Sequence, residues 1–156
     1  MDLVEITSTG NDVEIDLVYA TKRNFTGKPV YRTATCLLHR DGLEALNRAI
    51  ELARVLGLRF RIFDALRPGE AQWKLWAHLP NPEYVADPRR GSPHSRGIAV
   101  DLTLVDRDGQ VLDMGTEFDA FTPLSHHGNL LVGPETQRNR ALLLGIMTSA
   151  GWDFYR

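Results

Sequence analysis

The stretch 92–104, SPHSRGIAVDLTL, carries the residue types and spacing with the clearest chemical meaning in this chain. His94 precedes Asp101 by seven residues, and Asp101 lies inside an otherwise apolar strand pattern over 98–104. Alternate residues of a strand share a face, so the apolar side chains fall on one face and Asp101 on the other. A buried carboxylate is costly unless it is paired or coordinates a cation, and imidazole nitrogen and carboxylate oxygen are both zinc ligands. The pattern indicates two ligands of a catalytic zinc site.

A second interpretation of the same residues needs no metal. Asp101 would accept hydrogen bonds from backbone amides or pair with an arginine such as Arg96, and His94 would be an ordinary loop residue. The zinc interpretation requires the chain to bend so that the imidazole lies over Asp101, and Gly97 permits that bend. Spacing alone does not separate the two interpretations.

The surrounding pattern predicts the elements that would position this stretch. Alternation over 13–19 and again over 58–64 is typical of half-buried strands. Between them, apolar residues recur at helical spacing over 41–57, with capping-box spacing at the start and Gly57 at the end. Arg67-Pro68 then ends the second strand and begins a helix over 69–79.

The second half of the chain continues in the same style. A loop rich in proline leads to the strand over 98–104, and 106–109 has the composition of a hairpin turn before a returning segment over 110–114. A last helix is predicted from Pro134 to Gly151. Strands, helices and hairpins mixed in this order favour an α+β domain with a small, mostly antiparallel sheet and flanking helices.

Composition narrows the class of protein further. The 156 residues carry 18 Lys and Arg against 20 Asp and Glu, and the net charge of -2 argues against a nucleic-acid partner. No apolar run approaches the roughly 18 residues of a membrane span, so no membrane partner is expected. The first residues lack the pattern of a signal peptide, and Cys36 is the single cysteine. We expect one domain over 1–156 and a cytoplasmic location.

The stretch SPHSRGIAVDLTL is similar to the SxHxxGxAxD signature of the VanX-type D-alanyl-D-alanine dipeptidases, which are zinc peptidases of the lysostaphin, D-Ala-D-Ala carboxypeptidase and hedgehog fold. Five further segments resemble the family in the same order: IDLVYATKRNFTGKPVY, FDALRP, DMGTEFD, SHH and QRNRALLLGIMTSAGW. They cover nearly the whole chain. The resemblance implies zinc-dependent hydrolysis of the dipeptide D-alanyl-D-alanine to D-alanine.

The resemblance also assigns roles to single residues. It makes His94 and Asp101 ligands of one catalytic zinc ion, and it makes Arg67 the cation that stabilises the oxyanion formed when water attacks the peptide carbonyl. It suggests that Asp64 orients Arg67. The alternative for Arg67 is a surface salt bridge, which would contribute only about 0 to 1 kcal/mol of stability.

A free dipeptide has an ammonium and a carboxylate only a few bonds apart, and its site must recognise both. The family pattern places Tyr19 and Asp119 near the ammonium and Ser92 near the carboxylate. The alternatives are that Asp119 caps its own loop, that Tyr19 packs in the core and that Ser92 stabilises a turn. His126 and His127 match the SHH segment and are interpreted as loop residues.

One departure from the family concerns the C-terminal motif. In the family, a short strand after the last helix leads to ExxH, which supplies a general base and a third zinc ligand. Here the sequence ends at WDFYR, about where that motif should follow, and neither residue is present. Three explanations follow: a truncated chain of an active dipeptidase, a short homologue that takes ligands from another subunit, or a non-catalytic binder of D-amino-acid dipeptides or peptidoglycan fragments. A plain interaction domain would be indicated if His94 and Asp101 pointed apart.

Overall fold

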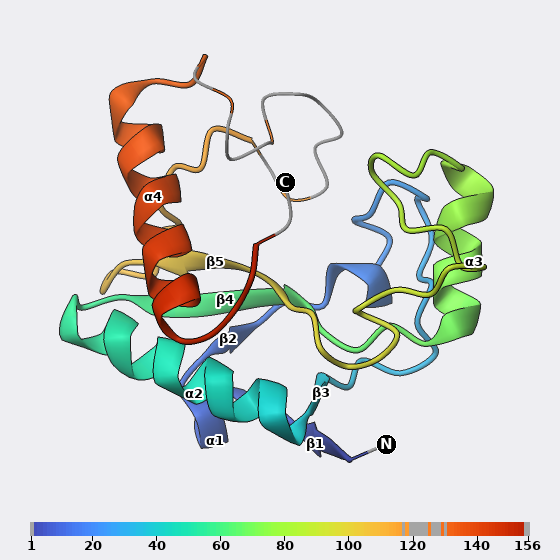
Figure 1. The fold of residues 1–156 in the computed structure, drawn as a ribbon, viewed down its shortest axis with the longest axis horizontal. Helices are drawn as coiled ribbons and strands as arrows, with labels where there is room; N and C mark the ends of the chain where they lie inside the picture. The colour runs from blue at the N-terminus through green and yellow to red at the C-terminus, as the bar shows by residue number, and fades with distance from the viewer. Residues whose placement is uncertain (1, 117, 119–124, 126–128, 130, 155–156) are drawn as a thin grey trace.

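The computed structural model describes residues 2–116, 118, 125, 129 and 131–154. The elements follow one another in an order that mixes short strands with helices (Figure 1). In chain order they are β1 Leu3–Glu5, α1 Ser8–Asn11, β2 Glu14–Ile15, η1 Val18–Ala20, β3 Leu37–His39, α2 Arg40–Val55, β4 Arg59–Asp64, α3 Gly69–His78, β5 Asp101–Val105 and α4 Pro134–Ser149. This confirms the predicted α+β class.

Strand β4 is the centre of the larger sheet, whose order is β2-β4-β5. It pairs in parallel with β2 and antiparallel with β5, while β1 and β3 form a separate antiparallel pair. The β4–β5 register is interrupted by a bulge, because Ile62 lies opposite Leu102 but Asp64 lies opposite Asp101. Phe63 is the extra residue, and the bulge brings two carboxylates to neighbouring positions.

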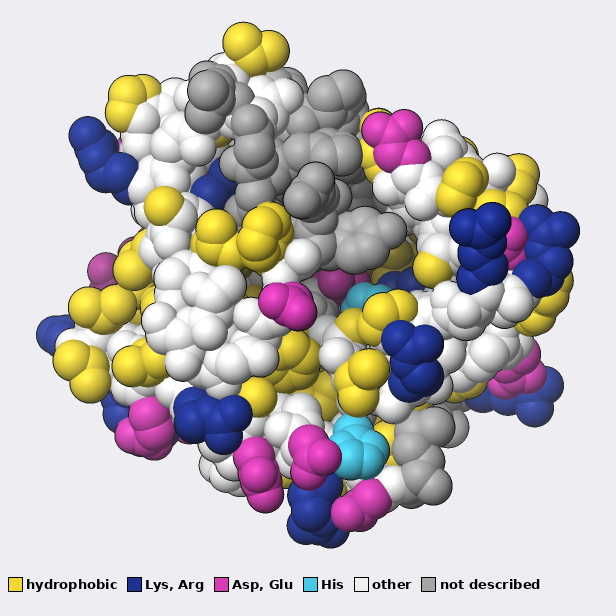
Figure 2. All heavy atoms as spheres, viewed as in Figure 1, with side chains coloured by type: hydrophobic (Ala, Val, Ile, Leu, Met, Phe, Trp, Pro, Cys, Tyr) yellow, Lys and Arg dark blue, Asp and Glu magenta, His cyan; other side chains and the backbone are white. Residues whose placement is uncertain are grey.

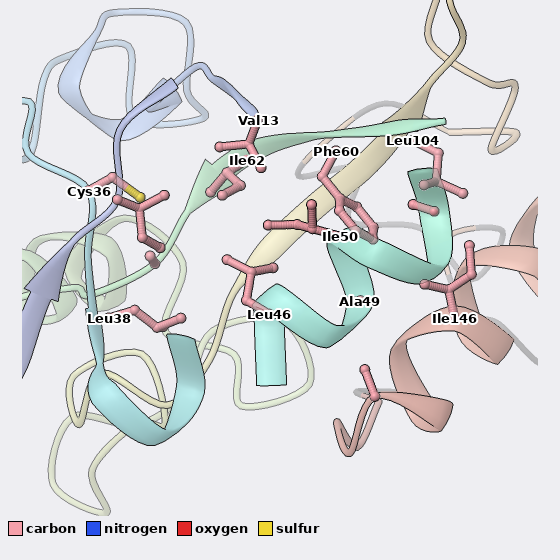
Figure 3. Close-up of a cluster of buried hydrophobic side chains, with 14 of the residues drawn as sticks. Val13, Cys36, Leu38, Leu46, Ala49, Ile50, Phe60, Ile62, Leu104 and Ile146 are labelled. Atoms are coloured by element: carbon pink, nitrogen blue, oxygen red, sulfur yellow. The ribbon is translucent and has the colours of Figure 1, made fainter. Parts of the chain in front are cut away.

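Helix α2 covers one face of this sheet (Figures 1 and 3). Its buried side chains Leu46 and Ile50 pack in one cluster with Phe60 of β4 and Leu104 of β5. Each fully buried side chain of this size contributes about 1.5 to 3 kcal/mol relative to exposure. The cluster also includes Ile146 of α4, so the last helix is fixed to the same core.

Helix α3 lies on the other side of the molecule and has its own apolar cluster (Figure 1). The cluster contains Tyr19 of η1 and Leu75 of α3, together with Val30, Ala71 and Val85. Because Tyr19 belongs to this cluster, η1 packs against α3.

Two strand predictions were too long. The segment predicted over 13–19 is a strand only at Glu14–Ile15, because the amide of Asp16 makes the last bond to Ile62 and the chain then turns into η1. The segment predicted over 98–104 begins as a strand at Asp101, since the amide of Ile98 bonds to Pro93 in the preceding turn.

The helix predictions came closer to the structure. Helix α2 begins at Arg40, and its cap is the His39 side chain, which accepts a hydrogen bond from the amide of Asp41, so the predicted capping box is replaced by a histidine cap. Helix α4 starts at Pro134 as predicted and is followed by Gly151 at φ 104°. That left-handed conformation favours glycine.

Basic and acidic side chains are interspersed on the face drawn in Figure 2. Among the residues that the structure describes, no helix is both long enough and apolar enough to cross a membrane.

Candidate active site

The candidate site lies where the end of β4, the start of β5 and the 92–97 turn come together. Asp64 and Asp101 are register partners across the bulge. The turn is tied to the segment after β4 by a backbone hydrogen bond of 2.9 Å from the amide of Arg67 to the carbonyl of His94. Strand pairing and this one bond therefore bring together two segments that are distant in sequence, one with Asp64 and Arg67 and the other with His94 and Asp101.

The His94 imidazole points at Asp101. Its Nε2 lies 3.4 Å from Asp101 Oδ1, and its Nδ1 lies 2.8 Å from the carbonyl oxygen of Ala65. A carbonyl can only accept, so Nδ1 carries a proton toward Ala65, and Nε2 is the nitrogen that faces Asp101 and can bind a metal ion once its own proton is lost. Two ligands about 2.0 to 2.2 Å from a tetrahedral ion lie roughly 3.3 to 3.6 Å apart. The pair fits a metal ion held between these two atoms.

The protonation of this pair follows from its surroundings. Burial lowers the pKa of His94, but the Asp101 carboxylate raises it, and the net direction is upward. Burial raises the pKa of Asp101, but the His94 and Arg67 cations lower it, and the net direction is downward. Without metal the two groups are mutually stabilised as an ion pair, so a metal ion would compete with a proton for Nε2.

Arg67 is buried beside them, which rules out a surface salt bridge. It is 7% exposed, and both its Nε and its Nη2 donate to Asp64 Oδ2, at 3.1 and 2.7 Å. Its Nη2 is also 3.8 Å from Asp101 Oδ2, and its guanidinium carbon lies 5.0 Å from the centre of the Tyr19 ring. Burial lowers the pKa of Arg67, yet the Asp64 carboxylate raises it and the net direction is upward. Arg67 therefore stays a cation.

Asp64 is fully buried and both of its oxygens have partners. Oδ2 accepts from Arg67, and Oδ1 accepts a short hydrogen bond from the Tyr31 hydroxyl. Burial raises the pKa of Asp64, and the Arg67 cation opposes that rise.

Asp64 also belongs to a possible metal-binding group. Donor atoms of Asp64, His94 and Asp101 all lie within 4.8 Å of one another. However, the His94 atom paired with Asp64, at 3.8 Å, is Nδ1, which already bonds to Ala65. The geometry therefore suits Asp64 as the counter-ion of Arg67 better than as a third ligand.

The three predicted substrate-binding residues are placed unequally. Tyr19 is 3% exposed and its ring covers Arg67. Ser92 is 2% exposed, its Oγ accepts the amide hydrogen of His94 at 3.2 Å, and it lines a small pocket at the start of α3. Asp119 lies outside the described residues, as do His126 and His127.

Two partners of the site were missed by sequence reasoning. Tyr31 and Gln72 both hydrogen-bond to the Asp64–Arg67 pair. No local pattern points to Tyr31, which lies in a loop. Gln72 gave a weak signal, because it is an uncharged polar residue on the face of α3 that carries Ala71 and Leu75.

An imidazole and a carboxylate at this separation, with a buried arginine next to them, are the kinds of group that a metal-dependent hydrolase uses. The comparisons with known proteins agree with this class. All 156 residues match the model of the peptidase M15 family described as D-ala-D-ala dipeptidase, and the chain belongs to that family.

Several relatives share most of the chain, and each carries the name D-alanyl-D-alanine dipeptidase. The protein from Escherichia coli (strain K12) is 48% identical over 151 residues, which is 97% of this chain and 78% of the relative. The protein from Enterococcus faecium is 34% identical over 92% of this chain and 81% of the relative. The protein from Streptomyces coelicolor is 33% identical over 99% of this chain and 87% of the relative.

Proposed function

We propose that this chain binds one catalytic zinc ion through His94 Nε2 and Asp101 and hydrolyses D-alanyl-D-alanine to D-alanine. The observation that carries the proposal is the 3.4 Å separation of those two donors, with the Arg67 guanidinium 3.8 Å from Asp101. The names of the relatives support the substrate. When bound, zinc would supply a water of lowered pKa and a Lewis acid for the peptide carbonyl.

Arg67 would stabilise the negative charge that develops on the carbonyl oxygen. A guanidinium has five N–H groups, and the hydrogen bonds to Asp64 and Gln72 use three of them. One N–H on Nη1 and one on Nη2 take no part in these three bonds, and Nη2, which lies 3.8 Å from Asp101 Oδ2, would be offered to an oxyanion next to Asp101. A donor of this kind, fixed in place before the reaction, lowers the barrier by roughly 3 to 4 kcal/mol.

Ser92, Tyr19 and Asp119 would recognise the ends of the dipeptide. Ser92 accepts a bond from His94, so its own O–H can still donate to the substrate carboxylate. Tyr19 lies against Arg67 and, with Asp119, would contact the ammonium. We also propose that residues 1–156 act as one domain in the cytoplasm.

His94 and Asp101 are two ligands, whereas catalytic zinc normally has three from the protein. A third ligand and a general base are therefore expected from outside the group of Asp64, His94 and Asp101.

The test is release of D-alanine from D-alanyl-D-alanine by the zinc-supplied chain, alongside the His94→Ala variant and with L-alanyl-L-alanine as control substrate. Release that requires His94, with one zinc bound per chain, is the expected result. Binding of the dipeptide without release would instead indicate a binding protein. If the chain neither releases D-alanine nor binds the dipeptide, the proposal is overturned.

A further inference from the structure

Gln72 has a buried side chain whose orientation is set by its partners. It is 1% exposed and lies in the first turn of α3. Its Nε2 donates to the carbonyl of Ala86 at 2.8 Å, and its Oε1 accepts from Arg67 Nη1 at 2.9 Å. The Ala86 carbonyl can only accept, so the amide nitrogen must face it and the amide oxygen must face Arg67. Gln72 is therefore a dedicated acceptor for Arg67.

The contact with Asp64 does not by itself fix the guanidinium. Both bonds from Arg67 to Asp64 end on the same atom, Oδ2. Two donors on one acceptor form a pivot, whereas a fork on two oxygens would hold the plane in one orientation. The Tyr19 ring limits tilting on one face of the guanidinium but does not stop rotation within its plane. Gln72 binds Nη1, on the far side of the pivot, and supplies the second fixed point.

We propose that Gln72 is a positioning residue, which sets the in-plane orientation of the Arg67 guanidinium and so aims its remaining N–H groups at the oxyanion. This inference rests on the proposed function and deepens it. Gln72 does not touch the substrate in this scheme and acts only through Arg67. A displacement of about 1 Å in a catalytic group can lower a rate roughly 10²-fold. Loss of the hydrogen bond between Gln72 and Arg67 Nη1 should therefore lower kcat.

The first arm of the test needs neither metal nor activity. Gln72→Met keeps the length and burial of the side chain and removes both hydrogen bonds. In NMR spectra of the Arg67 side chain, the Nη1 protons should lose their resolved signal as the group begins to rotate, while the Nε proton bound to Asp64 keeps its own. Unchanged Nη1 signals would overturn the proposal.

The second arm is kinetic. With zinc supplied, Gln72→Met should lower kcat about 10- to 100-fold. KM should stay within about threefold, because substrate ground-state binding does not use this contact. The matched control is Leu75→Val on the same helix face, which loosens α3 without touching Arg67 and should change kcat less than about twofold. If Gln72→Met also changed kcat by less than about twofold, the proposal would be overturned.

The two arms separate this inference from the proposed function. A chain that does not hydrolyse the dipeptide at all would count against the proposed function, and the NMR comparison would then decide the role of Gln72 alone. Loss of the Nη1 signal with the Nε signal retained would still support positioning of Arg67.

Discussion

The two ends of β4 both bury side chains, but the side chains are apolar at one end and charged at the other. At its start, Phe60 and Ile62 are fully buried by packing against α2 and β5. At its end, Asp64 continues the same alternation and is equally buried, but its neighbours are Arg67 and Tyr31. One end is stabilised by removing apolar surface from water, and the other by pairing charges that burial alone would disfavour.

The comparison shows why the polar end is suited to catalysis. Apolar packing tolerates small shifts, because dispersion contacts depend weakly on direction. A buried ion pair with hydrogen bonds has few alternative arrangements, and the removal of one member leaves the other uncompensated. The end of β4 therefore holds a cation at a fixed place next to the candidate metal ligands.

The largest effect is expected for Arg67→Ala. Because it leaves the Asp64 carboxylate buried and unpaired, the free energy of unfolding should fall by about 3 to 5 kcal/mol. In the hydrolytic chain, kcat should fall roughly 10²- to 10³-fold while zinc stoichiometry is unchanged. Urea denaturation, metal analysis and initial rates measure the three quantities.

Arg61→Ala is the matched control for this prediction, since Arg61 lies on β4, the strand that precedes Arg67, and pairs with Glu14 at 2.8 Å in a partly exposed position. It should reduce the free energy of unfolding by no more than about 1 kcal/mol. Equal destabilisation by the two substitutions would remove the distinction between the buried and the exposed pair.

Phe60→Ala probes the apolar end. It should reduce the free energy of unfolding by about 3 to 5 kcal/mol, because it removes a fully buried ring and leaves a cavity. The rate per folded molecule should stay unchanged, since Phe60 packs in the α2 cluster, whereas the Tyr19 ring that lies against Arg67 belongs to the separate α3 cluster. Rates normalised to the folded fraction test this, and a selective loss of kcat would show that the two ends are coupled.

Tyr31→Phe removes the hydroxyl that donates to Asp64 Oδ1. A buried acceptor without its donor should reduce the free energy of unfolding by about 1 to 3 kcal/mol. The effect should be smaller than for Arg67→Ala, since the ion pair remains. Thermal or urea unfolding measures it, with Thr148→Val, which removes an exposed hydroxyl that donates to the Leu144 carbonyl, as the control. A loss as large as that of Arg67→Ala would contradict the ranking.

At neutral pH the smallest effect concerns Cys36, which is buried in the apolar cluster and should change stability only at high pH. Burial raises the pKa of the Cys36 thiol from 9.0 to about 12, with added contributions from Asp64 and Glu5. The buried Cys36 thiol has a higher pKa in the folded chain than in the unfolded chain. Its contribution to stability is therefore complete below the pKa of the unfolded chain and is lost as the pH rises toward the pKa of the folded chain. Stability should therefore decline above about pH 9. A thiol reagent at pH 8 should label Cys36 only after unfolding, and rapid labelling of the native chain would contradict the burial.

The parts of the fold that follow local rules were predictable. Apolar residues at helical spacing predicted α2, and Pro134 with Gly151 marked the ends of α4. The strand ends were predicted less well. Strand β2 stops at Ile15 because the Asp16 amide makes the last hydrogen bond to β4, and this pairing depends on residues distant in sequence, such as Glu14 and Arg61, which are 47 residues apart.

For the candidate site, the sequence predicted which residues to inspect and the resemblance predicted their roles. The structure places His94, Asp101, Arg67 and Asp64 together, and it adds Tyr31 and Gln72, which no spacing indicated. Those partners could not be predicted, because which side chains meet at a buried charge depends on chain segments that are distant in sequence.

The sequence alone predicts the class of fold and the positions of the longer helices, because periodicity, capping and turn residues act over a few neighbouring positions, and it marks 92–104 as the stretch to inspect for a metal site. Only the tertiary structure decided that Asp64 faces Asp101. That pairing requires the bulge at Phe63, and a change of register by one residue alters which side chains meet across a sheet.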